Sequence, residues 1–193
     1  MRFDRASGLY VPGTSRRNAI RTITAGLLAV PVLEGFETEL PPTHPVSEGP
    51  AYKPGAPYRS EIIDPGTPGQ RFLLSGLVVS TAGKPVRDAI VDLWNVQNSG
   101  KYDFDGFNLR GRQLTGKDGR YHFLTIEAVP YGSRTAHFHF KVSAPGYAPL
   151  TTELYLAGLP TNARDSMYSA SNAIVPMDEA GIRKASFEFV LKS

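Results

Sequence analysis

Two histidines, His137 and His139, are the residues whose type and spacing most directly suggest chemistry. They lie in the segment "RTAHFHFKVS", which alternates in the manner of a β-strand. Successive side chains of a strand point to opposite faces, so both imidazoles share one face and the intervening apolar residues share the other. Neutral imidazole is the commonest metal ligand, and the pair could bind one ion. The alternative is a pair of hydrogen-bonded histidines on a half-buried face.

Further ligands of such an ion must be oxygen atoms, because the sequence contains no cysteine. Glu153, on the next expected strand, offers a two-histidine-one-carboxylate site as a minor option. Tyr131 precedes the histidines in the pattern Y-x-x-R-x-x-H-x-H, and Tyr102 ends the segment "WNVQNSGKY". A phenolate is a hard, strongly donating anion that favours ferric iron over zinc or ferrous iron. Each tyrosine could instead be a core or interface residue with one satisfied hydroxyl group.

Short apolar or alternating segments separated by turn sequences predict an all-β fold, an antiparallel β-sandwich. The expected strands are 71–80, 89–96, 120–126, 136–143, 150–158 and 185–193. We expect residues 71–193 to form the sandwich and the proline- and glycine-rich residues 39–70 to form an irregular arm that contributes to the site. Residues 159–181 are expected to form a long loop with at most one short helix. Long loops on a rigid scaffold often shape a site.

The length of 193 residues is typical of one domain with a tail, and the net charge is only +3, from 21 lysine and arginine against 18 aspartate and glutamate residues. The basic residues are scattered, whereas a nucleic-acid partner would need a clustered basic stripe. Disulfide frameworks and thiolate metal sites are excluded by the lack of cysteine.

Residues 1–38 place a twin arginine, Arg16 and Arg17, before a short apolar segment. The arrangement resembles a twin-arginine export signal. The usual aromatic residue after the arginine pair and a clear A-x-A cleavage site are both missing. The alternative is an N-terminal arm that packs on a neighbouring subunit, so cytoplasmic and exported locations both stay open. The apolar segment is too short and interrupted for a transmembrane helix.

Three segments together resemble one known family. "LSGLVVSTAGKPVRDAIVDLWNVQNSGKY" (Leu74–Tyr102), "GKDGRYHFLTI" and "PYGSRTAHFHF" closely resemble the intradiol ring-cleavage dioxygenases, the family of protocatechuate 3,4-dioxygenase and catechol 1,2-dioxygenase. The resemblance extends over residues 47–156, and "SEGPAY" in the arm resembles the substrate-side segment of the family. The short connection from Tyr131 to Arg134 is typical of the compact single-chain branch. Asp92 and Trp94 within the first segment are expected to be scaffold.

The resemblance implies that Tyr102, Tyr131, His137 and His139 are the four ligands of a non-haem ferric ion. Tyr131 would be the axial phenolate that a catechol displaces, and it would accept a proton as it leaves. Arg134 matches the active-site arginine of the family, although it could also pair with a nearby carboxylate. The implied substrates are a small aromatic diol and O2, the two atoms of which enter a cis,cis-muconate-type product.

Substrate contacts implied by the resemblance are Gly49, Pro50, Tyr52, Arg134 and Glu153. Many family members carry glutamine where this chain has Glu153. An acidic group facing the pocket would disfavour a substrate that carries an anionic carboxylate, and protocatechuate is such a substrate. The chain lacks the helical linker domain through which catechol 1,2-dioxygenases dimerise, so any homo-oligomer must use the arm or the sandwich surface.

Two other functions compete with an enzyme. The strands and turns also resemble transthyretin-like and carboxypeptidase-regulatory-like sandwiches, which are binding modules without an active site. Those domains do not need the Y-x-x-R-x-x-H-x-H pattern. A third possibility is an iron- or catechol-binding protein without turnover.

Overall fold

Two short strands and one long segment make up the described part of the chain in this computed structural model: residues 2–3, 10–11 and 39–193. Strands β1 (Arg2–Phe3) and β2 (Tyr10–Val11) pair antiparallel. The twin arginine and the apolar segment after it lie outside the described residues. Residues 39–193 lie within one compact unit.

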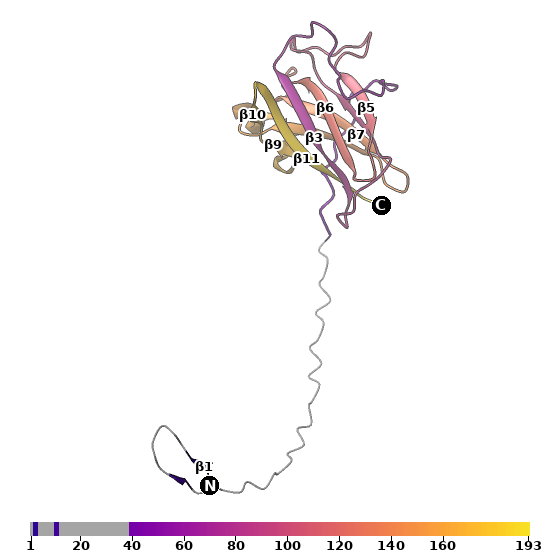
Figure 1. Cartoon of the computed structure of the whole chain (residues 1–193). Helices are drawn as coiled ribbons and strands as arrows, with labels where there is room; N and C mark the ends of the chain where they lie inside the picture. Colours follow the sequence, from indigo (N-terminus) through magenta and orange to yellow (C-terminus); the bar gives the residue numbers. More distant parts are fainter. Residues whose placement is uncertain (1, 4–9, 12–38) are drawn as a thin grey trace. The chain divides into compact units, whose positions relative to one another are not determined.

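Two β-sheets form a sandwich, which confirms the predicted fold class (Figure 1). The four-stranded sheet has the order β10 (Met177–Glu179), β11 (Ile182–Leu191), β3 (Arg71–Ser80), β6 (Arg120–Ile126). The five-stranded sheet has the order β5 (Arg110–Leu114), β4 (Ile90–Trp94), β7 (His137–Ser143), β8 (Leu150–Leu156), β9 (Ala173–Ile174). All six predicted strands are present. Strands β5, β9 and β10 were not predicted, since they are short or mostly polar.

The strand pairing is mainly antiparallel, as predicted, and two pairs that the sequence did not predict are parallel. Strand β11 lies parallel to β3, and β9 lies parallel to β8. All other pairs in the two sheets are antiparallel. The direction of a strand relative to its neighbour depends on the path by which the chain returns, and local alternation does not encode that path.

Aromatic and branched side chains from the inner faces of both sheets fill the core, as the pleat of alternating strands requires. Phe138, Phe140 and Val142 of β7 are fully buried there, on the face that the alternation predicted. Core partners from other strands include Phe72, Leu74, Leu93, Phe123 and Phe189. This packing fixes β7 and therefore also the residues on its opposite face.

The arm of residues 39–70 crosses both sheets without forming a strand of its own. Its backbone amides bond to Val190, Thr151 and Leu124 through Thr43 (3.1 Å), Val46 (2.8 Å) and Ile62 (3.0 Å). The side chain of Ile62 enters the core, and Ala51 is buried. These bonds hold the segment 47–52 beside the five-stranded sheet.

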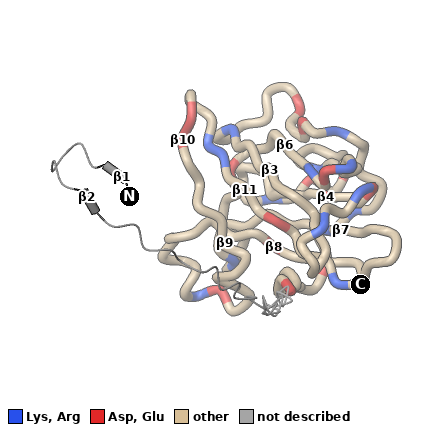
Figure 2. Tube along the Cα trace, turned by 60° about the horizontal axis from the view of Figure 1, so that its bottom comes forward, with Lys and Arg blue, Asp and Glu red and all other residues tan. Residues whose placement is uncertain are grey.

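The connection after β8 contains two short 3-10 helices, η1 (Pro160–Arg164) and η2 (Ala170–Asn172), where one short helix was expected at most. Within residues 39–193 and the two short N-terminal strands, no helix is long and apolar enough to span a membrane. Basic and acidic positions are interspersed over the sandwich (Figure 2), and several pair with each other, as Arg183 does with Glu127.

Candidate metal and substrate site

The face of the five-stranded sheet that points away from the core carries the candidate site. His139 of β7 lies opposite Trp94 of β4 and Glu153 of β8, and His137 lies opposite Tyr155. Directly opposed residues of antiparallel strands project on the same side. Both histidines are buried, with 2% and 6% of their surface exposed. The register of three strands therefore gathers these side chains in one place.

The two imidazoles point their Nε2 atoms toward each other, 3.1 Å apart. His137 Nδ1 lies 2.6 Å from the carbonyl oxygen of Thr135, which only accepts, so Nδ1 carries the proton of the neutral ring and Nε2 has a free lone pair. The His139 ring stacks on Trp94 at a centroid distance of 4.9 Å. Burial lowers the pKa of both histidines, which keeps them in the neutral form that binds metals.

Two tyrosines complete the group. The hydroxyl group of Tyr102 lies 2.8 Å from His139 Nε2, and Tyr102 is only 7% exposed. The ring of Tyr131 contacts that of Tyr102 edge-on at 5.0 Å and is 42% exposed. Burial, followed by the charge of Glu153, raises the pKa of Tyr102 well above its ordinary value. A Tyr102 phenolate therefore needs a cation beside it.

A cavity of about 230 Å³ brings the predicted residues together. Ligand pockets usually measure roughly 300–1,000 Å³, so this one suits a single-ring molecule. Its lining contains all four predicted metal ligands and Gly49, Pro50, Arg134 and Glu153, with further contributions from Ser47, Glu48, Ala51, Phe104 and Met167.

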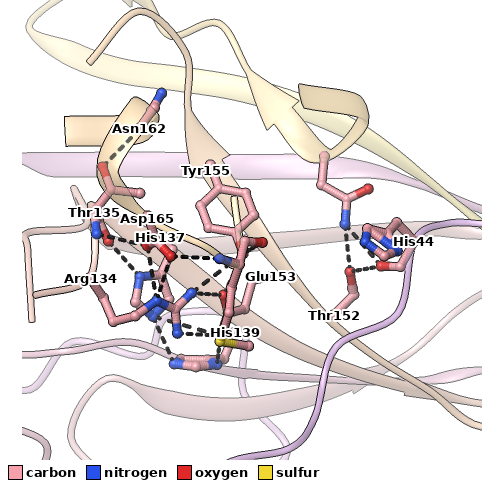
Figure 3. Close-up of polar contacts among 12 residues, drawn as sticks. His44, Arg134, Thr135, His137, His139, Thr152, Glu153, Tyr155, Asn162 and Asp165 are labelled. Atoms are coloured by element: carbon pink, nitrogen blue, oxygen red, sulfur yellow. Dashed lines mark hydrogen bonds and ion pairs between the residues drawn. The ribbon is translucent and has the colours of Figure 1, made fainter. Parts of the chain in front are cut away.

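Tyr52 does not line the cavity, although the sequence placed it among the substrate contacts. Its ring packs against Trp94 at 4.9 Å, and its hydroxyl group donates to Asp92 at 3.2 Å. The other two histidines also lie elsewhere. His122 is exposed on β6, and His44 offers its backbone carbonyl to Thr152 and Asn172 in the arm region (Figure 3).

Arg134 is held between two carboxylates (Figure 3). Its Nε donates to both oxygens of Asp165, at 3.0 and 2.9 Å, while Nη1 and Nη2 each donate to one oxygen of Glu153. The Tyr155 hydroxyl group lies 2.6 Å from Glu153 Oε2. Burial alone would raise the pKa of Asp165, but the Met167 amide and Arg134 hold it below its ordinary value. Pairing of Arg134 with a carboxylate was one alternative in the sequence analysis, and the structure shows that Arg134 pairs with two carboxylates.

Two donor sets could hold a metal ion. Ligand atoms of His137, His139 and Glu153 lie within 4.8 Å of one another. Both Glu153 oxygens, however, are already bound by Arg134. The Tyr102 oxygen makes no other side-chain or backbone hydrogen bond among the described residues. His137 Nε2, His139 Nε2 and the hard phenol oxygen of Tyr102 thus converge. Once the protons shared among them are released, these three atoms form a donor set that fits iron.

Two charged residues near the site, Asp165 and Arg110, were not predicted from the sequence. Asp165 lies in the loop of residues 159–181, which was expected to shape a site, but no spacing connects it to Arg134. Arg110 is 1% exposed and donates to the carbonyl oxygens of Asp103 and Ala51. Its guanidinium group lies 5.9 Å from the Tyr102 ring and forms no ion pair with the described residues. The buried cation favours a negative charge on Tyr102.

Known proteins resemble the chain over the sandwich and much of the arm. A family model described as "Dioxygenase" matches residues 47–193. The chain is 34% identical to catechol 1,2-dioxygenase 2 of Acinetobacter lwoffii, over 72% of this chain and 60% of that protein. It is 31% identical to a chlorocatechol 1,2-dioxygenase of Rhodococcus opacus, over 74% of this chain and 68% of the relative. The chain thus spans about 60% of the length of the first of these relatives.

Solved structures agree with this relationship. The dioxygenase domain of a dioxygenase carbohydrate-binding protein fusion from Streptomyces sp. SirexAA-E superposes with a TM-score of 0.76 and 38% identity, over 79% of this chain and 99% of that one. Catechol 1,2-dioxygenase from Pseudomonas arvilla C-1 gives a TM-score of 0.70 at 28% identity, over 77% and 62% of the two chains. The family model and the relatives show that the chain belongs to the intradiol ring-cleavage dioxygenase family.

Proposed function

We propose that this protein is a non-haem ferric intradiol dioxygenase. It opens the ring of a catechol-type substrate between the two hydroxylated carbons, and both atoms of O2 enter a cis,cis-muconate-type product. One observation carries the proposal: His137 Nε2, His139 Nε2 and the Tyr102 hydroxyl group converge, 2.8 and 3.1 Å apart, on a cavity the size of one aromatic ring.

Tyr102, Tyr131, His137 and His139 would hold the ferric ion. When bound, the iron would supply a Lewis acid that coordinates the catechol oxygens and makes the ring reactive toward O2. The two histidines are neutral, so the two tyrosines provide the negative charge that a buried ferric ion needs. Their strand is fixed from behind by Phe138 and Phe140, which are fully buried.

The two tyrosines have different roles because their surroundings differ. Tyr102 is buried and lies beside the cation of Arg110, so its phenolate would stay in place as an iron ligand. Tyr131 is 42% exposed, and its hydroxyl group has no hydrogen-bond partner among the described residues. Tyr131 would therefore be the iron ligand that a catechol replaces, and its oxygen would accept a proton from a substrate hydroxyl group.

The arm and Arg134 position the substrate ring. Gly49 has φ of 71°, a conformation that glycine tolerates, and Pro50 follows it along the cavity wall. Arg134 has 22% of its side chain exposed, and its two ion pairs hold the guanidinium group in one orientation. One hydrogen of its Nη1 has no partner among residues 39–193 and can donate to a substrate oxygen. The ring is thus held by directed contacts rather than by size alone.

Turnover of the iron-loaded protein with catechol under labelled dioxygen tests the proposal. We expect one O2 consumed per ring opened, and mass spectrometry should find both labelled atoms in the product. If the protein bound catechol without consuming O2, the proposed enzymatic function would be wrong. The protein would then be an iron- or catechol-binding protein without turnover. A product with one labelled atom would also contradict intradiol dioxygenation.

A further inference from the structure

We propose that Glu153 and Asp165 make the site selective for catechols whose ring substituents carry no negative charge. The inference rests on the proposed function and specifies its substrate class. The expected substrates carry hydrogen, alkyl or halogen substituents, and catechols with a carboxylate are disfavoured.

The charge balance around the cavity is the first observation. Among the described residues that line the cavity, Arg134 is the one lysine or arginine. Two carboxylates bind that single guanidinium group, and the side chains of Glu153 and Asp165 are 1% and 0% exposed. One positive and two negative charges leave this group with a net negative charge. Glu48 also lines the cavity, and its charge is balanced by its ion pair with Lys141.

The directions of the hydrogen bonds are the second observation. An arginine recognises a carboxylate through two parallel N–H groups. In Arg134 the Nη1 and Nη2 groups already face Glu153, and Nε faces Asp165. A substrate carboxylate would have to displace Glu153 and leave a buried charge without its partner, or accept only the one free hydrogen of Nη1 while lying beside the charge of Glu153. Both arrangements are costly.

The rest of the wall suits uncharged substituents. Phe104 and Tyr131 stand at the exposed end of the cavity, and Pro50 and Met167 add apolar surface. Tyr155 keeps Glu153 in place through its hydroxyl group, 2.6 Å from Oε2. The negative charge is therefore built into the wall of the cavity rather than carried by a mobile side chain.

A pair of ligands with nearly the same shape and different charge tests the inference. 3,4-Dihydroxybenzoate carries a carboxylate, and 3,4-dihydroxybenzamide replaces it with a neutral amide. We would measure the dissociation constants of both by anaerobic spectral titration of the iron-loaded protein, and then kcat/KM with O2. The wild-type protein should bind the amide at least about tenfold more tightly than the acid.

Glu153→Gln keeps the shape of the side chain and removes its charge, so it should reduce the amide-to-acid ratio by about tenfold. Glu127→Gln is the matched control, because Glu127 also binds an arginine, Arg183, but does not line the cavity. This control should keep the wild-type ratio. If Glu153→Gln fails to load iron, Asp165→Asn removes a charge from the same arginine and should shift the ratio in the same direction.

Equal affinity for acid and amide in the wild-type protein would overturn the inference, as would an unchanged ratio in a variant that loads iron. A protein that neither binds nor cleaves catechol itself would instead contradict the proposed function. Catechol therefore serves as the reference ligand in every titration.

Discussion

The two faces of the five-stranded sheet are both buried, yet they are built from different residues. Phe138 and Phe140 point into the core, and their burial needs only close packing. His137, His139 and Glu153 point the other way and are almost equally inaccessible, with 1–6% of their surface exposed. Buried polar groups need hydrogen-bond partners. Here they bond to one another and face a cavity in which a ligand could supply further partners. A second buried face made of such residues therefore indicates a site rather than a second core.

The largest effect is expected on the polar face. His139→Ala removes one of two imidazoles that share a metal ion, so bound iron should be lost and turnover should fall at least about 1,000-fold. Metal analysis and O2 consumption measure the result, and the unfolding transition should remain cooperative. Full activity in this variant would contradict the assignment of the ligands.

The core face should respond in the opposite manner. Phe140→Ala leaves a cavity among fully buried side chains, and the free energy of unfolding should fall by about 3–5 kcal/mol. Denaturant titration of the metal-free protein measures this loss. Iron bound per folded molecule should stay near the wild-type value. Lost iron with unchanged stability would mean that the two faces are not separate in function.

Asp92, on the polar face of β4, links stability to pH. Burial raises the pKa of Asp92 from 3.8 to about 6. The folded protein therefore binds this proton more tightly than the unfolded chain does, and stability falls as pH rises between these values, by about 3 kcal/mol. Asp92→Asn should remove that part of the pH dependence and stabilise the protein above pH 6. Parallel pH profiles of the two proteins would show that Asp92 is ionised without cost.

Tyr131→Phe tests the exposed edge of the polar face. The variant should retain some iron through the other three ligands, lose colour intensity and turn over about 100-fold more slowly, because the proton acceptor is missing. Absorption spectra and kcat measure these effects. A Tyr131→Phe protein with the wild-type spectrum would place the second phenolate elsewhere.

The smallest effect is expected at the four-stranded sheet. His122 is exposed on β6 and does not line the cavity of the candidate site. His122→Ala should change the free energy of unfolding by less than about 0.5 kcal/mol and leave the iron content unchanged. Loss of iron in this variant would show that the metal site includes His122 and is not confined to the predicted ligands.

The sequence predicts the separation of the two faces well, because strand alternation is local. It places His137 and His139 together and opposite the apolar side chains, and it predicts the strand that carries them. It does not predict that Asp165 and Glu153 share Arg134, nor that the Arg110 guanidinium group lies near the Tyr102 ring. Those contacts depend on how loops and neighbouring strands meet across long sequence separations, and the parallel pairing of β11 with β3 has the same origin.

The visible absorption spectrum of the iron-loaded protein, recorded with metal analysis before and after anaerobic addition of catechol, tests the central claim most directly. Two tyrosine ligands on ferric iron should give a broad charge-transfer band. Catechol should shift that band to longer wavelength as it replaces Tyr131. A protein that binds one iron per chain and stays colourless would contradict tyrosine ligation. It would leave His137, His139 and Glu153 as the metal site.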